Sequence, residues 1–507
     1  MRLKYLYIKD YKKFHEIEIK FESEFGNTNL YKKYYPNLNF NILVGENGVG
    51  KTTIMSFISR VFNNLQRYHE KIESDFVLKY DILHEDTNEE IAVTIKKEEM
   101  NIYFMAEGYI EDSLLLEWSP YRKNSKPKAY QLIHTNITNF TTYNEIRCFL
   151  PKNIITSVFS IHGEYPESRN DNYLGDKILE VYKISDVYGS NHYKIKSISK
   201  GIVKFIRLCK NNSSVQDLLE ILNLRYTFKA KVHLNCTEYF LNEFSFEPWR
   251  EFINSLGYSA WEEFYFIFVS EYHQDKCMMF WKWASDPDCE EYIYEAEYDI
   301  LNSSYIIDMN KLFELEEKYK IEIINKLLDY QLAHFNDMFF IKQNSYETSL
   351  YTMSSGEKMF FIRILSILTS IENNSLIIIE EPELHLNPSW TKQIISMIEL
   401  LFGEYKANFL IATHSYSFIN NLFTENILLL TEDTIQNPNI KTLLANEREI
   451  SNNFFKNSRC YNYIEKKVVN NLENASIEEL EDMLSYLGES YYAFLVYKQI
   501  QKVKGVQ

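Results

Sequence analysis

The stretch GENGVGKT, Gly45 to Thr52, is the feature that most restricts how this 507-residue chain can fold. It matches G-x-x-x-x-G-K-[ST] fully, follows the apolar run Phe40–Val44, and precedes a segment with apolar residues at helical spacing. The pattern predicts a buried strand, a glycine loop and a helix, in which backbone N–H groups face phosphate oxygens and Lys51 reaches the β- and γ-phosphates. The Thr52 hydroxyl would ligate Mg²⁺. The residues expected to bind nucleotide are Gly45, Glu46, Asn47, Gly48, Val49, Gly50, Lys51, Thr52 and Thr53.

Two adjacent acids end a second apolar run, SLIIIEEPE. Leu376–Ile379 predicts a central strand whose carboxyl end brings Glu380 and Glu381 beside the phosphates. The two carboxylates would divide the work: Glu380 holds the Mg²⁺ shell, and Glu381 orients or deprotonates the attacking water. A solvated acidic turn is the alternative interpretation, and the presence of a complete phosphate loop disfavours it.

A third apolar run, NFLIATHS, ends at His414. A histidine in that position can donate to the γ-phosphate and sense its loss, whereas taken alone it is more often a turn-capping or core residue. Because the phosphate loop and the acidic pair accompany it, we predict that His414 is a catalytic residue together with Glu381.

The segment MSSGE precedes a helical pattern, so Ser354, Ser355, Gly356 and Glu357 are expected at a helix start, where N–H groups and hydroxyls form an anion site. A plain serine helix cap fits the same residues. Since the chain already has a phosphate loop, a second anion site makes sense if it closes over nucleotide held by another subunit.

Short apolar runs separated by helical patterns are typical of a parallel sheet covered on both faces, and the strand-like segments of the first hundred residues predict an additional antiparallel sheet. Helical patterns dominate the middle of the chain, interrupted by the strand-like FKAKVHLN. We therefore expect an α/β fold. Its predicted parts are an N-terminal lobe at 1–165, a mostly helical insertion at 166–344, a C-terminal lobe at 345–430 and a helical C-terminal region at 431–507.

The composition sets limits on partners and location. The net charge of −17 repels nucleic acid, so contact with DNA would need a local basic patch or a partner. The six cysteines show no metal-like spacing and are expected to be reduced thiols. The absence of an export signal and of a long apolar run predicts a cytoplasmic protein without a membrane partner.

In this order, the phosphate loop, MSSGE, IIIEEPE and ATHS resemble the ATP-binding-cassette (ABC) ATPases of the SMC/RecF type. The phrase EEPELHLNP resembles most closely the ATPases of the overcoming-lysogenisation-defect (OLD) group and related anti-phage defence proteins. By this likeness the motifs are Walker A (Gly45–Thr52), the signature (Ser354–Glu357), Walker B (Glu380–Glu381), the D-loop region (Glu383–Asn387) and the switch histidine (His414). The resemblance covers about half the chain. It implies an ABC-type ATPase head that uses ATP and Mg²⁺, and a head-to-head dimer or higher even oligomer with each ATP held between a phosphate loop and the opposing signature.

Some residues depart from the pattern. Glu380 stands where many relatives have Asp, and a glutamine-loop residue is not identifiable, although VFSIHGEY is a candidate for that region. The acidic pattern of a TOPRIM nuclease does not follow His414, so we expect an ATPase without a nuclease. The arrangement resembles defence systems of the Septu kind, in which a standalone ATPase, PtuA, works with a separate HNH nuclease; a TOPRIM effector, as in systems of the PARIS kind, is the alternative.

A RecF/SMC-like DNA repair or chromosome-maintenance ATPase that binds DNA directly is a competing prediction. It needs a basic groove, which KYLYIKDYKK, YRKNSKPK and KIKSISKGIVKFIRLCK could supply, although such clusters are more often solvated faces. A transporter ATPase docked to membrane subunits is disfavoured by EEPELHLNP and by the long insertion.

Overall fold

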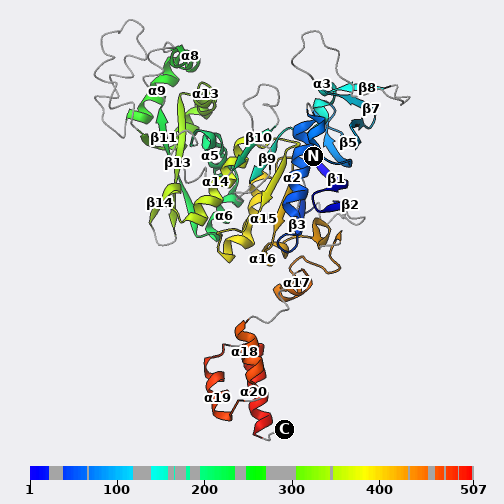
Figure 1. Ribbon diagram of the computed structural model, residues 1–507. Helices are drawn as coiled ribbons and strands as arrows, with labels where there is room; N and C mark the ends of the chain where they lie inside the picture. Colours follow the sequence, from blue (N-terminus) through cyan, green and yellow to red (C-terminus); the bar gives the residue numbers. More distant parts are fainter. Residues whose placement is uncertain are drawn as a thin grey trace. The chain divides into compact units, whose positions relative to one another are not determined.

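The three apolar runs that precede the motifs lie in one seven-stranded sheet, in the order β10-β9-β15-β16-β3-β17-β18 (Figure 1). All neighbours are parallel except β17 and β18. The central strands β3, β15 and β16 are buried almost throughout, which explains their unbroken apolar sequences. The predicted parallel sheet is therefore confirmed. Its strands are β10 (Ile178–Tyr182), β9 (Ile154–Ser157), β15 (Leu376–Glu380), β16 (Asn408–Thr413), β3 (Asn39–Val44), β17 (Ile427–Leu430) and β18 (Ile435–Gln436).

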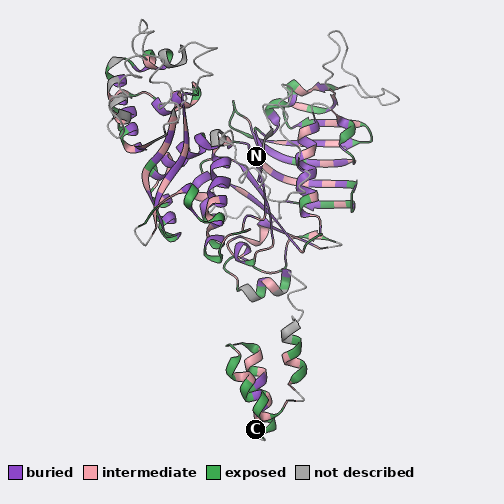
Figure 2. Ribbon diagram, turned by 60° about the vertical axis from the view of Figure 1, so that its left-hand side comes forward, coloured by how far each residue is buried: buried purple, intermediate pink, exposed green. Residues whose placement is uncertain are grey.

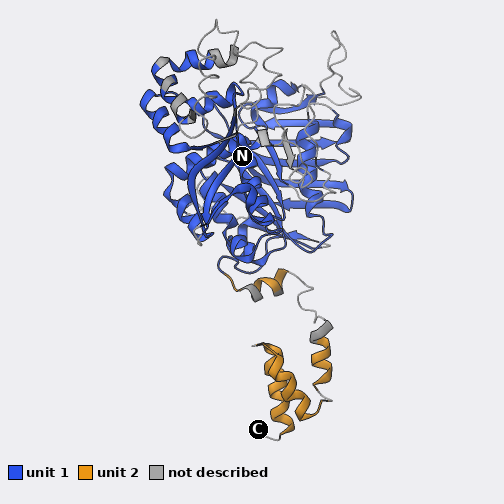
Figure 3. Ribbon diagram, turned by 90° about the vertical axis from the view of Figure 1, so that its left-hand side faces the viewer, with its two compact units in different colours: residues 1–444 blue, residues 445–507 orange. Residues whose placement is uncertain are grey.

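The structure is a computed structural model. It describes residues 1–21, 33, 38–65, 68–117, 139–157, 165, 178–182, 195–234, 247–269, 304–342, 346–431, 434–454, 463–472, 475–488 and 490–504. The chain forms two compact units, 1–444 and 445–507 (Figure 3). The four-part division predicted from the sequence is finer than this and stays a prediction.

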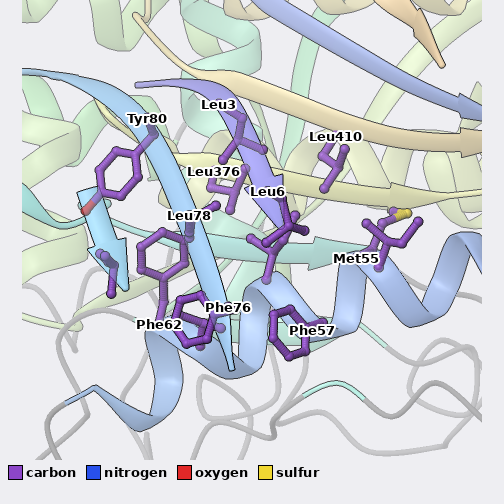
Figure 4. Packing of buried hydrophobic residues seen from close by; sticks show 14 of the residues in the cluster. Leu3, Leu6, Met55, Phe57, Phe62, Phe76, Leu78, Tyr80, Leu376 and Leu410 are labelled. Carbon is purple, nitrogen blue, oxygen red and sulfur yellow. The ribbon is translucent and has the colours of Figure 1, made fainter. Parts of the chain in front are cut away.

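A second seven-stranded sheet, antiparallel except for β7 and β8, forms from the N-terminal segments, as expected. Its strands, in sheet order, are β2 (Phe14–Lys20), β1 (Arg2–Tyr11), β4 (Phe76–Leu83), β5 (Glu90–Glu98), β6 (Asn101–Ala106), β7 (Ile110–Leu116) and β8 (Phe140–Thr142). Helix α2 (Lys51–Asn64) shares one apolar core with this sheet and with strands of the parallel sheet (Figure 4). Residues such as Leu6, Phe57 and Leu410, one from each element, are at most 2% exposed. This core fixes the start of α2, and with it the phosphate loop, against both sheets.

The middle segment contains more β structure than its helical patterns suggested. The strand expected at FKAKVHLN is part of β11 (Leu224–Leu234), which pairs with β12 (Ser304–Asp308) and β13 (Ala333–Lys342); β14 (Glu347–Ser349) completes an antiparallel sheet. The helical pattern expected to run to Phe335 ends at Asp329, because Gln331 takes a left-handed φ of 56° and the alternating burial of a strand follows.

The remaining helices of the first unit cover the sheets or belong to the middle segment. They are α3 (Tyr143–Ile146), α5 (Ile195–Asn211), α6 (Ser213–Ile221), α8 (Glu247–Leu256), α9 (Tyr258–Val269), α12 (Met309–Tyr319), α13 (Ile323–Asp329), α14 (Ser355–Ser370), α15 (Pro388–Phe402) and α16 (Tyr416–Ile419), with short 3₁₀ turns at His69–Lys71, Arg147–Phe149, Leu350–Thr352 and Thr424–Asn426. Among the described residues, none of the helices combines the length and the apolarity that crossing a bilayer requires.

The second unit is helical, as expected for the C-terminal region. It contains α17 (Glu447–Phe454), α18 (Tyr463–Asn471), α19 (Ile477–Tyr486) and α20 (Tyr491–Val503). Its small core is built on Leu480, Val496 and Ile500, and most of its helical surface is exposed (Figure 2).

Candidate nucleotide site

Three neighbouring parallel strands bring the predicted motifs to one edge of the sheet. Strand β16 lies between β15 and β3, with Ile411 opposite both Ile379 and Ile42. The phosphate loop follows β3, the acidic pair ends β15, and His414 follows β16. In open α/β sheets, ligands bind at the carboxyl ends of the strands, so this edge is the candidate nucleotide site.

The phosphate loop is packed against the turn between β1 and β2. Gly50 has φ of +100°, and a Cβ added to it would lie 2.4 Å from the Phe14 ring. The Lys13 ammonium donates to the Gly48 carbonyl. Only glycine adopts this positive φ readily and leaves room for the Phe14 ring, so the shape of the loop depends on Gly50. Of the other loop residues, Asn47 is exposed, Glu46 is half-buried, and Val49 is buried.

Lys51 is buried inside the loop that it belongs to. Its Nζ donates to the carbonyl oxygens of Gly45 (2.8 Å) and Glu46 (3.0 Å). Burial lowers the pKa of Lys51 to about 8, although the charge of Glu381, the strongest of three neighbouring acids, opposes that shift. The ammonium is therefore still charged at neutral pH. Thr52 is exposed and Thr53 is half-buried in the first turn of α2.

Glu380 is buried at the end of β15, with 6% of its surface exposed. Its Oε1 accepts a hydrogen bond of 2.7 Å from the hydroxyl of Tyr165. Burial, and then the charge of Glu380, raise the pKa of Tyr165, so the phenol keeps its proton and acts as the donor. The Glu380 carbonyl accepts from Nη2 of Arg363, at 3.4 Å. Glu380 is thus held at its side chain and at its main chain.

Glu381 faces away from this buried network. It takes a left-handed φ of 44°, its N–H donates to Ala412, and its side chain is 43% exposed. Its Oε1 lies 3.7 Å from Nε2 of His414. The two neighbouring acids therefore have different environments: Glu380 is fixed and buried, and Glu381 is accessible beside the histidine.

His414 is connected to both neighbouring strands. Glu383 accepts hydrogen bonds from the His414 N–H (2.9 Å) and the Thr413 hydroxyl (2.7 Å), and the imidazole bonds to the Gly45 backbone. Burial and then the charge of Lys51 lower the pKa of His414. The imidazole is therefore mainly neutral at pH 7, and it can serve as a hydrogen-bond donor without carrying charge.

The MSSGE segment begins a helix, α14, at Ser355, and Ser354 is its N-cap. The Ser354 N–H and hydroxyl both donate to Glu357, which also accepts from Lys342 at 2.9 Å. Although burial opposes it, the hydrogen bonds from Lys342 and Ser354 lower the pKa of Glu357. Ser354 and Ser355 are exposed. The structure thus places Lys51, Glu380, Glu381 and His414 together, and turns the two signature serines toward solvent.

Gly356 joins this helix tip to the D-loop region. A Cβ at Gly356 would lie 2.2 Å from the carbonyl oxygen of His385, so no other residue fits without a shift of the backbone. His385 has a left-handed φ of 65°. The helix tip and the loop that follows the acidic pair are therefore packed tightly against each other in the same chain.

Sequence reasoning missed two residues of this site. Tyr165 lies in VFSIHGEY, the candidate for the glutamine-loop region, but its approach to Glu380 depends on long-range packing; most of that segment lies outside the described residues. Arg363 is a lone cation in the apolar run MFFIRILSIL. A single charged residue in an apolar run could have identified Arg363, because a buried arginine requires hydrogen-bond acceptors. Burial lowers the pKa of Arg363 to about 9, against the opposing charge of Glu383.

The residues of this edge suit Mg²⁺ bound together with phosphates. The described residues contain no cluster of three or more His, Cys, Asp or Glu side chains that could hold a metal ion. Mg²⁺ usually takes one or two protein oxygens and completes its shell with phosphates and water. Exposed Thr52, and Glu380 with its Oε1 engaged by Tyr165, offer such a donor set.

The basic clusters that could line a DNA groove are partly neutralised. YRKNSKPK lies outside the described residues. In the other two clusters, several cations form ion pairs with acids, as in Lys4–Asp81 (2.6 Å), Lys9–Asp75 (3.2 Å), Lys200–Asp329 (3.6 Å), Arg207–Glu316 (2.9 Å) and Lys210–Glu317 (2.6 Å). A cation that is already paired releases fewer counterions from DNA, so these surfaces are weak candidates for a DNA interface.

Comparison with known protein families agrees with these motifs. One model, described as "AAA domain", matches residues 5–245, and a second, "AAA domain, putative AbiEii toxin, Type IV TA system", matches residues 263–420. Both models are thus described as AAA domains, and each matches less than half of the chain. Each match ends within the first unit and includes one part of the site: the phosphate loop in the first, and the signature, acidic pair and histidine in the second.

Two curated relatives are ATPases of retrons. The chain is 27% identical over 139 residues to the "Retron Vc95 probable ATPase" of Vibrio cholerae serotype O1 biovar El Tor, which covers 25% of the chain. It is 28% identical over 141 residues to the "Retron Ec83 probable ATPase" of Escherichia coli, which covers 26% of the chain. The match spans 26% of the length of each relative. The chain is thus similar to two retron ATPases over about a quarter of its length.

Solved structures of SMC head domains also align. One from Pyrococcus furiosus, bound to the C-terminal domain of ScpA, aligns over 86% of this chain and 95% of its own at a TM-score of 0.33 and 10% identity. The SMC head domain from Thermotoga maritima aligns over 87% of this chain and 100% of its own, at a TM-score of 0.31 and 12% identity. Scores at this level are too low to support an argument about function.

Proposed function

We propose that this chain binds and hydrolyses ATP with Mg²⁺, as an ABC-type ATPase head. The observation that carries the proposal is the meeting of Lys51, the pair Glu380–Glu381, and His414 at one edge of the parallel sheet. Lys51 is near enough to the acids for their charges to raise its pKa against burial. A buried cation, a fixed carboxylate and an accessible carboxylate are the groups that phosphoryl transfer to water requires.

The residues would act as follows. The loop N–H groups and Lys51 bind the phosphates, and Thr52 and Glu380 hold the cation, which supplies positive charge to the phosphate oxygens. Glu381, exposed and free of the Tyr165 contact that fixes its neighbour, orients or deprotonates the attacking water. His414, mainly neutral, has a single ring N–H, which would turn from the Gly45 backbone to the γ-phosphate when nucleotide binds, while its main-chain N–H stays bonded to Glu383.

The active assembly would be a head-to-head dimer, or a higher even oligomer, in which each signature tip closes over the partner's nucleotide. The exposure of Ser354 and Ser355 at the N-terminus of α14 supports this, because an exposed helix N-terminus attracts phosphate. The capping box orients Glu357 toward Lys342, which leaves the serines on the outside of the tip.

The biological role that we propose is in bacterial anti-phage defence, where the chain senses a trigger and regulates a separate nuclease. The relationship to two retron ATPases supports a place in a defence system. A Septu-like arrangement with an HNH nuclease is the partner that we propose, with a TOPRIM effector as the alternative, and we place the complex in the cytoplasm. DNA would be contacted through the complex.

ATP hydrolysis by the purified chain tests the enzymatic proposal. Wild type should release phosphate from ATP only with Mg²⁺, and Glu381→Gln should bind ATP but turn it over about 100-fold more slowly. Glu404→Gln, at an exposed position, is the matched control and should keep the wild-type rate. Equal rates for wild type and Glu381→Gln would reject Glu381 as the base. Co-expression with the products of adjacent genes, followed by affinity purification, tests for the nuclease partner.

A further inference from the structure

The hydroxyl of Tyr165 is a buried polar group whose role the nucleotide chemistry above does not explain. Tyr165 and Glu380 are each 6% exposed, and 2.7 Å separates the phenol oxygen from Oε1. Tyr165 follows β9, which pairs with β15 along Ile155 and Ile377. The hydroxyl of Tyr165, a residue C-terminal to the neighbouring strand, therefore bonds to the last residue of β15.

A buried carboxylate is costly unless hydrogen bonds compensate for lost water. The Tyr165 hydroxyl supplies such a bond at Oε1 without bringing a second charge into the site. Arg363 donates to the Glu380 carbonyl at 3.4 Å, so a second hydrogen bond reaches this residue at its main chain.

These contacts orient the side chain. Arg363 holds the main chain of Glu380, and Tyr165 holds one carboxylate oxygen, so the rotamer is fixed from both ends. With Oε1 engaged, Oε2 is the oxygen available to a cation. Hydrogen-bond partners of metal-binding carboxylates commonly act in this way, by orienting the ligand before the metal arrives.

We propose that Tyr165 is a positioning residue for the cation that accompanies the nucleotide, acting through the hydrogen bond from its hydroxyl to Glu380 Oε1. The inference rests on the proposed function, because it assumes that Glu380 holds Mg²⁺ beside bound ATP. It assigns to Tyr165 an indirect role in metal affinity, through Glu380, that the sequence does not reveal.

The test is Mg²⁺ titration of the binding of a fluorescent ATP analogue, which needs no hydrolysis. Tyr165→Phe removes one oxygen and keeps the ring, so apolar packing is retained. We expect it to raise the Mg²⁺ concentration for half-maximal binding about 10-fold. Binding measured in EDTA should be unchanged, because the variant leaves the phosphate loop intact. A purely structural role would weaken binding equally with and without Mg²⁺.

Tyr80→Phe is the matched control. The Tyr80 hydroxyl is also buried and donates to a buried acceptor, the Phe149 carbonyl, at 2.8 Å. Loss of the Tyr80 hydroxyl should lower the Tm about as much as Tyr165→Phe does. It should leave the Mg²⁺ concentration for half-maximal binding at the wild-type value. The comparison separates the loss of a buried hydrogen bond in general from the loss of this one.

A double-mutant cycle with Glu380 tests whether Tyr165 acts through the carboxylate. Glu380→Gln alone should weaken the Mg²⁺ dependence, and adding Tyr165→Phe to it should have little further effect, since the tyrosine acts through the carboxylate. Additive effects would overturn the inference, as would a Mg²⁺ titration of Tyr165→Phe that coincides with wild type. If wild type itself shows no Mg²⁺-dependent binding, the proposed function fails as well.

Discussion

The phosphate loop and the signature tip are both helix starts that we propose bind anions, but they differ in how the chain surrounds them. The loop is packed against its own subunit: Phe14 lies against Gly50, and Lys51 is only 8% exposed. At the signature tip, Ser354 and Ser355 are exposed, and the side chain of Ser354 bonds within the tip, to Glu357.

The difference indicates where a second subunit is needed. A helix start that is packed within its own chain can bind nucleotide in that chain, whereas an exposed helix start can contact a phosphate that a second copy of the chain binds. On this account the loop determines whether nucleotide binds, and the tip determines whether bound nucleotide joins two chains. Of the variants below, Lys51→Ala and Gly356→Ala each target one of these regions, and Glu399→Gln spares both.

Lys51→Ala should have the largest effect, because it removes the loop side chain that we propose reaches the phosphates. We expect ATP affinity to fall more than about 100-fold, measured by calorimetry. Lys152→Ala, which breaks an exposed ion pair with Glu85, is the control and should bind as wild type does. Normal ATP affinity in Lys51→Ala would show that the loop is not the binding element.

Gly356→Ala should damage the tip and spare the loop. Its Cβ would lie 2.2 Å from the His385 carbonyl oxygen, so the helix start or the D-loop region must move. We expect ATP-dependent dimerisation to weaken about 10-fold, measured by analytical ultracentrifugation, with binding of ATP to the monomer unchanged. Gly488→Ala, where a Cβ meets nothing within 4 Å, is the control. Loss of nucleotide binding in Gly356→Ala would mean that the two regions are not separable.

Glu399→Gln should have the smallest effect and spare both regions. Burial raises the pKa of Glu399, on α15, to about 7. Between about pH 4.5 and 7 the unfolded chain releases this proton and the folded chain keeps it, so the residue lowers stability as pH rises through that window. The substitution should therefore stabilise the fold at pH 8 and not at pH 4.5. Discounted for partial exposure, the gain is about 1 kcal/mol, seen as a small rise in Tm.

Glu404→Gln, at an exposed position, is the control and should have the wild-type Tm at both pH 4.5 and pH 8. A stabilisation of Glu399→Gln that is equal at both pH values would contradict the ionisation argument. ATP binding and dimerisation should remain unchanged in either variant, which would confirm that the scaffold can be altered without affecting the loop or the tip.

The sequence predicted the parallel sheet well, because fully buried strands leave unbroken apolar runs and their ends carry the motifs. Ile377–Ile379 and the acids that follow are one example. The sequence predicted only one of the strands of the middle segment, the part of β11 at FKAKVHLN. Strand β13 pairs with β11 across more than a hundred residues of chain, and such pairing is not encoded in local periodicity.

The same distinction applies to the site. Lys51, Glu380, Glu381 and His414 stand at the ends of apolar runs, where a pattern can identify them, and their catalytic roles stay predictions. Tyr165 contacts Glu380 across more than two hundred positions. Contacts of this kind follow from packing between distant segments. The sequence could therefore identify VFSIHGEY only as a candidate for the glutamine-loop region, and not the contact of Tyr165 with Glu380.

The central claim, that the exposed signature tip binds a nucleotide held by a second copy, is tested most directly by molar mass in solution. Light scattering of Glu381→Gln with ATP and Mg²⁺ should give at least twice the 60.6 kDa of one chain, and without ATP the monomer. Adding Ser354→Arg should keep ATP binding but abolish the dimer, whereas Ser485→Arg, at an exposed serine of the C-terminal unit, should not. A dimer that persists unchanged with Ser354→Arg, or a Glu381→Gln protein that stays monomeric with bound ATP, would contradict the claim.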